Sequence, residues 1–320
     1  MHGLKGKRFF IILPTFMDGE SVTILVQRIS STLRTEFREP QVTFLLVDES
    51  LGQDKDLNEL IAQSSKDSRN SEKLVLMTPT YRGGNQAAIL WALHTFDWPT
   101  DENAILVVMD SDGEDSPTDL TKLILKLFDS NLDLVYAKRG KRYAPIKFKI
   151  GRFFFQSLFR ILTGSPLETG NFSVMRVSWL KKCLNTGSFT SSFAGELSFM
   201  KARKEAVYCN RAPRLNGMSK TNLSALVSFG FKQLIPWSEI ISVRAFFFFL
   251  LSSFLAGGTT LFTLFLKYGL DLATPTWSTL VVGLSLIIAL LSFVLFVISI
   301  SIVIQVDTAK RLVRRISSTS

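Results

Sequence analysis

Four acidic side chains occur within six residues, at Asp110, Asp112, Glu114 and Asp115. Carboxylates this close repel one another unless a cation neutralises them, and hard oxygen ligands suit Mg²⁺ or Mn²⁺. Such an ion would bridge a diphosphate and offset the charge that builds on a departing nucleotide diphosphate. The alternative interpretation is a solvated acidic loop in which Asp115 or Ser116 caps the helix that follows.

The position of the acidic segment favours the first interpretation. It directly follows an apolar run at residues 104–109, and a further aspartate, Asp48, follows a second apolar run at 42–47. Short continuous apolar runs of this kind are typical of buried strands. Because ligands of parallel sheets lie outside the carboxyl ends of the strands, we expect Asp48 and Asp110 to face a common ligand.

Strand-like and helix-like segments alternate along the first 136 residues. We predict strands at 9–14, 42–47, 74–77, 104–109 and 132–136, and helices at 21–37, 57–64, 86–95 and 118–128. This alternation predicts an α/β fold with a mostly parallel sheet that has helices on both faces. No strand is followed by a Gly-x-Gly-x-x-Gly turn or a Walker-type loop, which argues against a dehydrogenase or a P-loop enzyme.

The C-terminal part of the chain has a different composition. Residues 245–266 and 272–306 contain no charged side chain, and a helix needs roughly 20 apolar residues to cross a membrane. A short break at 267–271, followed by Pro275, supplies a turn. We therefore predict a soluble domain over 1–240, two transmembrane helices at about 245–266 and 277–304 within 241–306, and a basic tail at 307–320.

Charge asymmetry predicts the orientation of this hairpin. Basic residues flank its two ends, at Arg244, Lys310, Arg311, Arg314 and Arg315. The turn between the helices carries only Lys267, offset by Asp271. Since basic flanks mark the cytoplasmic side, we expect an integral protein of the inner or plasma membrane with the soluble domain and both termini in the cytoplasm.

The net charge of +10 raises the alternative of nucleic-acid binding. The charge is concentrated, however, because residues 138–160 hold eight basic side chains and no acid, interleaved with phenylalanines and aliphatic residues. A basic, aromatic-rich amphipathic helix next to transmembrane spans is better explained by an anionic membrane surface. We predict juxtamembrane segments at 138–160 and 222–240, with the lipid bilayer and not nucleic acid as partner.

Short motifs follow one another in a set order: Pro-Thr-Phe-Met-Asp at 14–18, Val-Asp-Glu-Ser at 47–50, Gln-Ala-Ala-Ile at 86–89, the acidic segment at 110–117, Val-Tyr-Ala-Lys-Arg-Gly-Lys-Arg at 135–142, Thr-Gly-Asn-Phe at 169–172 and Arg-x-x-Gly-x-Ser-Lys at 214–220. In this order they resemble the family 2 polyprenyl-phosphate glycosyltransferases, which include dolichyl-phosphate mannose synthases and bacterial enzymes that place glucose on undecaprenyl phosphate. The resemblance covers nearly the whole chain and implies a GT-A-type fold.

The resemblance implies a role for each matching residue. Those implied to bind the nucleotide sugar are Pro14, Asp18, Asp48, Asp110 and Arg139. Those implied to bind the donor diphosphate or the acceptor phosphate are Arg142, Arg214, Ser219 and Lys220. The implied ligands of Mg²⁺ or Mn²⁺ are Asp112 and Glu114, and the implied catalytic residues are Asp110, Asn171 and Glu168.

The implied reaction is metal-dependent, inverting transfer of a sugar from a nucleotide-diphosphate sugar to a polyprenyl phosphate of the undecaprenyl type. The product would be a lipid-linked monosaccharide for the modification of cell-surface glycans. The acceptor oxygen would attack the anomeric carbon from the face opposite the leaving diphosphate.

Two departures from the family pattern keep an alternative open. Asn171 stands where the family has an aspartate, and Ser173 replaces an arginine. A phosphate acceptor is already ionised near neutral pH and mainly requires positioning, and Glu168 could supply residual acid–base function. The alternative is a catalytically impaired, glycosyltransferase-like membrane scaffold or regulator. A processive polysaccharide synthase is disfavoured because its Gln-x-x-Arg-Trp motif is absent. The oligomeric state is left open, with a homo-oligomer as one option.

Overall fold

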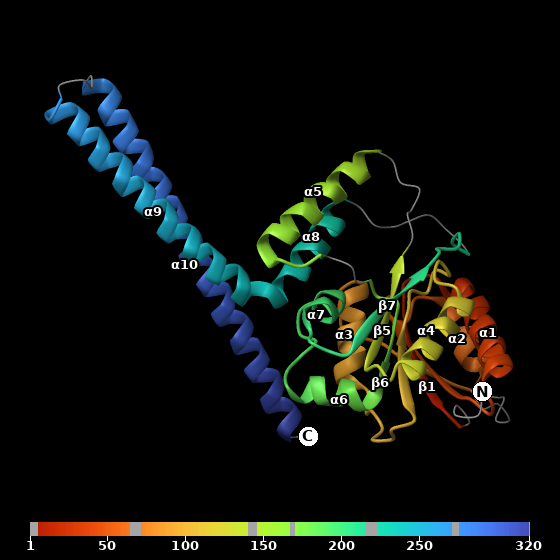
Figure 1. The fold of residues 1–320 in the computed structure, drawn as a ribbon. Helices are drawn as coiled ribbons and strands as arrows, with labels where there is room; N and C mark the ends of the chain where they lie inside the picture. The colour runs from red at the N-terminus through yellow and green to blue at the C-terminus, as the bar shows by residue number, and fades with distance from the viewer. Residues whose placement is uncertain are drawn as a thin grey trace.

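The computed structural model describes residues 6–64, 72–139, 146–166, 170–215, 223–270 and 275–319 of the 320-residue chain. In this part of the chain seven strands form one sheet in the order β3-β2-β1-β4-β6-β5-β7 (Figure 1). Only β6 runs antiparallel to its neighbours, β4 and β5. The other pairs are parallel, which confirms the mostly parallel sheet expected from the sequence.

The strands are β1 (Arg8–Thr15), β2 (Gln41–Asp48), β3 (Glu72–Met77), β4 (Ala104–Val108), β5 (Leu134–Arg139), β6 (Ser173–Arg176) and β7 (Lys204–Cys209). The helices are α1 (Gly19–Glu36), α2 (Lys55–Ser64), α3 (Asn85–Thr95), α4 (Pro117–Asp129), α5 (Ile146–Thr163), α6 (Val177–Asn185), α7 (Phe193–Phe199), α8 (Leu223–Leu234), the 3₁₀ turn η1 (Ile235–Trp237), α9 (Ser238–Tyr268) and α10 (Pro275–Thr319).

Helices cover both faces of the sheet, as predicted. Side chains alternate along β1, so that Phe9, Ile11 and Leu13 pack on the side of α1, α2 and α4. Phe10 and Ile12 point the other way and pack on the side of α3, α6 and α7. Figure 1 shows these two helical layers on opposite sides of the strands. The buried strands therefore read as continuous apolar runs because each face has its own core.

Helices α9 and α10 form a hairpin whose tip extends away from the sheet domain, and the C-terminal part of α10 runs back to the level of α6 (Figure 1). The segments Val227–Tyr268 and Thr276–Thr308 are long and apolar enough to be candidate membrane spans. Most of their large side chains point outward, and Phe254 is 78% exposed. Helix α10 continues to Thr319, so the basic residues expected in a tail belong to the same helix.

Polar side chains and aromatic rings hold the hairpin together. Ser252 and Ser292 share a hydrogen bond of 2.6 Å between their hydroxyl oxygens, and Thr259 and Ser285 share one of 2.9 Å. Small hydroxyl residues allow the two helices to approach closely, and the Ser252–Ser292 hydrogen bond is buried between them. The hairpin is therefore a packed unit.

A joint around the buried rings of Phe159 and Trp237 connects the hairpin to the sheet domain. The ring of Trp237 meets Phe159 of α5 at a centroid distance of 6.0 Å and Phe199 of α7 at 5.2 Å, both edge to face. Arg244 of α9 donates to the carbonyl of Ile161 in the last turn of α5. We call Phe159, Phe199, Trp237 and Arg244 the joint.

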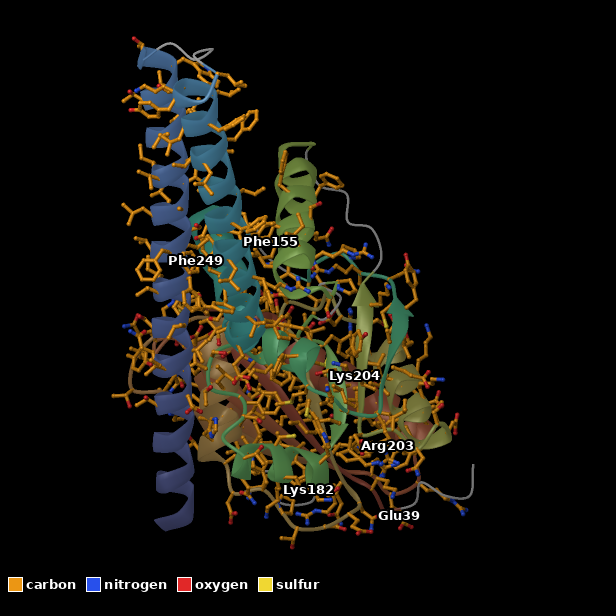
Figure 2. The ribbon with its side chains drawn as sticks, turned by 60° about the vertical axis from the view of Figure 1, so that its left-hand side comes forward. Glu39, Phe155, Lys182, Arg203, Lys204 and Phe249 are labelled. Atoms are coloured by element: carbon orange, nitrogen blue, oxygen red, sulfur yellow. The ribbon has the colours of Figure 1, made fainter. Side chains whose placement is uncertain are left out.

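Helix α5 carries exposed apolar side chains beside this joint. Phe153, Phe154 and Ile161 are 67–71% exposed, whereas Phe159 on the opposite face is fully buried. Figure 2 shows Phe155 of α5 and Phe249 of α9 on the hairpin side of the molecule, while Lys182, Arg203 and Glu39 lie toward the other end of the sheet domain. Because α5 contacts α9, the exposed apolar side chains of α5 lie beside the first candidate span.

Candidate functional site

The carboxyl ends of β1 and β2 lie side by side, with Thr15 paired to Asp48. The Asp48 side chain is fully buried, and its two oxygens accept the N–H groups of Ser50 and Gly52, each at 2.8 Å. Pro14 is buried at the end of β1, and Asp18 is the N-cap residue of α1. Asp48 therefore fixes the loop after β2.

Met17, between Pro14 and Asp18, has a φ of 53°. Left-handed backbone is uncommon for a side chain of this kind and is favoured by glycine and asparagine. Strained residues of this type cluster where a structure holds a ligand. The strained turn after β1 therefore marks this end of the sheet as a candidate ligand site.

Glu49 joins two loops at this edge. Its side chain is 5% exposed and its Oε1 accepts the N–H of Gly83, 3.1 Å away, in the loop before α3. In the same loop, the guanidinium of Arg82 lies 3.5 Å from the centroid of the Phe16 ring. Burial raises the pKa of Glu49 above its ordinary value, against the opposing effects of the Gly84 and Gly83 N–H groups.

This raised pKa predicts the effect of Glu49→Gln on stability. A folded-state pKa above the unfolded value contributes stability below the unfolded pKa of about 4.5, and that contribution is lost as pH rises through the folded pKa. The introduced amide keeps an acceptor for the Gly83 N–H without the buried charge. We expect the variant to gain on the order of 1 kcal/mol in free energy of unfolding at pH 8 and nothing at pH 4. Thermal melts against pH measure this.

The exposed substitution Glu59→Gln, on α2, is the matched control and is expected to leave the melting curve unchanged at both pH values. A Glu49→Gln gain that is the same at pH 4 and pH 8 would contradict the explanation.

The acidic segment follows β4 and is folded against the loop at 211–215. The N–H of Ala212 donates to the Glu114 carbonyl at 2.9 Å, and that of Leu215 donates to the Asp112 carbonyl at 3.0 Å. Gly113 has a φ of +77°, and a Cβ there would lie 2.5 Å from Leu215. A larger residue at 113 is therefore excluded twice, by conformation and by space.

Two arginines from this loop meet the predicted metal ligands. Arg214 lies 2.9 Å from Asp112 and 3.0 Å from Glu114, and Arg211 lies 2.6 Å from the other Glu114 oxygen. Arg214 also interacts electrostatically with Asp18. The structure thus brings Asp18, Asp112, Glu114 and Arg214 together at this edge of the sheet.

Burial raises the pKa of Asp112, and the nearby carboxylates of Asp110 and Glu114 act in the same direction, opposed by Arg214 and by the Glu114 N–H. A buried carboxylate with like charges nearby favours a bound cation. Ser116, in turn, caps α4 by accepting the Thr118 N–H at 3.3 Å. The capping part of the alternative interpretation therefore holds for Ser116 and coexists with the acidic site.

The carboxylates of the acidic segment fit a divalent ion that is also held by substrate phosphates. Within the described ranges, no three His, Cys, Asp or Glu side chains converge on one point. Mg²⁺ commonly takes one or two carboxylates and completes its shell with water and substrate phosphates. Asp112 fits this mode, while Glu114 fits it only after Arg211 and Arg214 release its oxygens.

A network of amides surrounds Asp110. Its Oδ1 accepts from Asn85 Nδ2 at 3.1 Å and from Asn171 Nδ2 at 3.0 Å. Asn171 Nδ2 also donates to Asn85 Oδ1 at 3.1 Å, and Asn171 Oδ1 accepts from Gln86 Nε2 at 2.5 Å. Asp110 and Asn171, two of the predicted catalytic residues, are thus in direct contact.

Several predicted site residues cannot be placed in this arrangement. Arg142, Glu168, Ser219 and Lys220 lie outside the described residues, and for Arg139 only the backbone, at the end of β5, is described. The sequence reasoning, conversely, assigned no role to Glu49, Asn85, Gln86 or Arg211. The available signal was position alone: Glu49 and Gln86 lie within predicted motifs, Asn85 directly precedes one, and Arg211 lies three residues before another.

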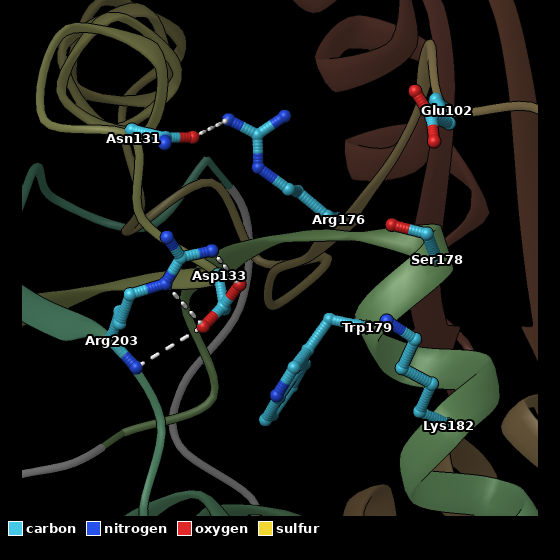
Figure 3. Close-up of a pocket in the computed structure, with 8 residues that line it drawn as sticks. All are labelled: Glu102, Asn131, Asp133, Arg176, Ser178, Trp179, Lys182 and Arg203. Carbon is cyan, nitrogen blue, oxygen red and sulfur yellow. Dashed lines mark hydrogen bonds and ion pairs between the residues drawn. The ribbon is translucent and has the colours of Figure 1, made fainter.

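A cavity of about 240 Å³ lies at the other edge of the sheet (Figure 3). It is lined by Glu102, Asn131, Asp133, Arg176, Ser178, Trp179, Lys182 and Arg203. Arg203 forms ion pairs with Asp133 down to 2.8 Å, and Arg176 donates to Asn131 and to a backbone carbonyl. Arg203 and Arg176 thus bind groups at or just before the starts of β5 and β7. This cavity is separate from the end of the sheet where Asp48 and Asp110 lie.

Comparison with known proteins defines the fold class. No protein-family model matches this chain, and no curated protein is similar to it in sequence. Solved structures are similar in fold, and this similarity supports the GT-A-type fold expected from the sequence.

Glucosyl-3-phosphoglycerate synthase from Mycobacterium tuberculosis, in complex with Mn²⁺, uridine diphosphate and glucosyl-3-phosphoglycerate, has a TM-score of 0.50 and 14% identity, over 74% of this chain and 80% of that one. Its complex with Mn²⁺, UDP-glucose and phosphoglyceric acid gives 0.50 and 15% over the same shares. S. aureus TarS with UDP-GlcNAc gives 0.44 and 16%, over 74% and 66%. At these identities the likeness defines the fold alone.

Proposed function

We propose that this chain transfers a sugar from a nucleotide-diphosphate sugar to a polyprenyl phosphate at the cytoplasmic surface of a membrane, with inversion at the anomeric carbon. The observation that carries the proposal is an acidic, arginine-lined sheet edge joined by short segments to a long apolar hairpin. The elements on either side of that edge support the two halves of the reaction separately.

The donor half rests on the sheet edge. We assign Pro14 and Asp18 to the base and ribose, since they lie at and just after the carboxyl end of β1, where ligands of such sheets bind. Asp48, fully buried with both oxygens accepting backbone N–H groups, would act on the base and ribose through the loop that it fixes. Asp110 is assigned to the sugar or ribose, and Arg139 to the nucleotide sugar.

Asp112 would hold Mg²⁺ or Mn²⁺ together with the donor diphosphate, and such an ion neutralises charge on the departing diphosphate. Glu114 remains a proposed second ligand, which would become available when Arg211 and Arg214 bind the donor diphosphate instead. The similar synthase was crystallised with Mn²⁺ and uridine diphosphate, which supports this ligand class. Arg214 stands next to Asp112, where its planar fork suits phosphate oxygens.

The acceptor half rests on proximity to the apolar surface. The backbone N–H of Leu215 donates to the carbonyl of Asp112. Leu215 precedes the first residue of α8 by eight positions, a distance of at most about 29 Å along the chain. Helix α5, with its exposed phenylalanines, follows β5 by a similarly short segment. A lipid phosphate held at the surface of the bilayer therefore has a short route to the site, with Arg142, Ser219 and Lys220 proposed as its further partners.

The chemistry at position 171 favours a phosphate acceptor. Asn171 is an amide and cannot take a proton from an alcohol, whereas a phosphate monoester is already largely ionised, because its second pKa is about 6. Its oxygen requires positioning more than deprotonation. Glu168 remains the proposed source of any acid–base assistance.

We place the soluble domain and both termini in the cytoplasm. Basic side chains lie at the two ends of the hairpin, including Arg244 at the joint, and they mark the cytoplasmic side of a membrane protein. The product would be a lipid-linked monosaccharide used for surface glycans.

A second candidate is a glycosyltransferase-like scaffold without chemistry. The arginine pairs on Glu114, together with the amide at position 171, favour it. It predicts nucleotide binding without transfer.

The test uses the full-length protein in lipid nanodiscs with Mg²⁺ or Mn²⁺, a panel of radiolabelled nucleotide sugars, and either undecaprenyl phosphate or undecaprenol. We expect label in the lipid fraction with one donor, only with the phosphate. Equal transfer to the alcohol would contradict the acceptor assignment, and no transfer with any donor would favour the scaffold.

A further inference from the structure

Gln86 lies in the first turn of α3 and is 7% exposed. The two ends of its amide contact different parts of the chain. Its Nε2 faces Asn171, and its Oε1 lies 3.2 Å from both the Ser192 hydroxyl and the Ala194 backbone nitrogen. Gln86 therefore connects the start of α7 to the residues around Asp110.

The orientation of this amide follows from chemistry. A backbone N–H can only donate, so the end of Gln86 that faces Ala194 must be the oxygen. Ser192 caps α7 by accepting the N–H of Gly195 at 3.3 Å, which leaves its own proton for the same Gln86 oxygen. The NH₂ end of Gln86 must then face Asn171.

The same reasoning extends one residue further. With Gln86 donating, the atom of Asn171 that faces it is Oδ1. Asn171 Nδ2 consequently points at Asp110 Oδ1, 3.0 Å away. The backbone of α7 thus decides which end of the Asn171 amide meets Asp110.

The start of α7 is itself rigid. Glu196 is 4% exposed and accepts the N–H groups of Phe189, Thr190 and Ser191 at 2.5, 2.6 and 3.1 Å. On its other side, α7 packs against α8, where a Cβ on Gly195 would lie 2.9 Å from the Gln233 Cα. The hydrogen bonds that run from α7 through Gln86 to Asn171 therefore begin at a rigid helix start, which packs against α8.

We propose that Gln86 is a positioning residue: it relays the orientation of the α7 backbone to Asn171, so that Asn171 donates to Asp110 and holds that carboxylate for the donor sugar. The relay deepens the proposed transfer reaction and rests on it for the identity of the reaction. The hydrogen-bond geometry itself does not depend on the donor or the acceptor.

Gln86→Glu tests the relay through pH. In this variant a protonated carboxyl at position 86 still donates to Asn171 Oδ1 and accepts from the Ala194 N–H. When that carboxyl ionises, one of its oxygens faces Asn171 Oδ1, and neither of these two acceptors has a proton to donate. The folded state therefore raises the pKa of the introduced carboxyl above the unfolded value of about 4.3. The variant should match wild type at low pH and become progressively less stable as pH rises through the folded pKa.

Two readouts are measured between pH 5 and pH 8. Relative to wild type, the melting temperature of Gln86→Glu should fall with rising pH, and kcat should fall by about 10- to 100-fold while KM changes little. Gln27→Glu, exposed on α1, is the control for added charge. The double variant Gln86→Glu with Asn171→Ala removes the opposing oxygen and should flatten the pH dependence of the melting temperature.

The outcomes separate the relay from the proposed reaction. If the double variant keeps the full pH dependence, burial alone causes it and the relay is wrong. A Gln86→Glu variant with wild-type kcat and stability at pH 8 would also overturn it. If wild type transfers no sugar but the melting profiles behave as expected, the relay stands and the proposed function fails.

Discussion

Asp112→Asn is expected to reduce sugar transfer by about 10²- to 10³-fold without lowering the melting temperature. Of the two proposed metal ligands, Glu114 is paired with both Arg211 and Arg214, whereas Asp112 is paired with Arg214. The introduced asparagine lacks the charge that attracts the ion. Its amide oxygen can still accept the Glu114 N–H, which Asp112 Oδ1 accepts at 3.0 Å.

The fold should survive because the charge itself is costly there. Burial raises the pKa of Asp112, so replacement by a neutral amide relieves a desolvation cost. Arg214 keeps its partner Glu114, 3.0 Å away. The measurement compares initial rates and the Mn²⁺ concentration required for half-maximal rate.

Asp97→Asn is the matched control, because Asp97 is exposed and lies two residues after the C-terminal end of α3. Transfer by Asp112→Asn at the wild-type rate would contradict the assigned role. Loss of transfer together with an unchanged cellular phenotype would support the scaffold alternative.

Trp237→Ala is expected to have the largest effect on stability. Trp237 is 6% exposed and its ring packs edge to face on both Phe159 and Phe199, so the truncation leaves a cavity at the joint. Removal of a buried tryptophan side chain costs about 3–5 kcal/mol of unfolding free energy. For a domain of this size we expect the melting temperature to fall on the order of 10 °C.

Trp277→Ala is the matched control, because Trp277 begins α10 and is 47% exposed. Its loss should leave the soluble domain's melting temperature unchanged. Similar small effects for both tryptophans would show that the joint does not stabilise the sheet domain.

The joint also has a consequence for activity. It holds α5 against α9 and α7, and hence sets how the acidic edge faces the apolar surface. Trp237→Ala should therefore raise the KM for a lipid acceptor more than the KM for the nucleotide sugar at temperatures where the variant is folded. This comparison separates misalignment from unfolding.

The central strands could be predicted from sequence because both faces of the sheet are covered. The apolar run at 104–109 became β4 (Ala104–Val108), and the run at 42–47 became β2 (Gln41–Asp48). The predicted strand at 132–136 is displaced, since β5 spans Leu134–Arg139. Its last residues, including Lys138, pair with β7 and are polar, so hydrophobicity gave no signal there.

The remainder of the sheet was not predictable in this way. Strand β6 has four residues and α7 has seven, too short for either periodicity to emerge. β6 is antiparallel and buried between β4 and β5, a placement that depends on tertiary contacts.

In the candidate site, too, some residues could be predicted from local sequence and others depend on tertiary contacts. Asp48, Asp110 and Asp112 were found because they follow apolar runs. Arg211 became visible only when its loop was seen to lie along the acidic segment, and the role of Gln86 depends on α7, which is more than a hundred residues away in the chain.

The central claim is that the acidic edge holds a divalent ion together with a nucleotide diphosphate, and Mn²⁺ binding tests it most directly. Free Mn²⁺ is followed by electron paramagnetic resonance as the full-length protein in nanodiscs is added, with and without each nucleoside diphosphate. We predict that one nucleoside diphosphate makes wild type, but not Asp112→Asn, remove Mn²⁺ from solution in proportion to protein. Equal Mn²⁺ uptake by both proteins, or none with any nucleoside diphosphate, would contradict the account.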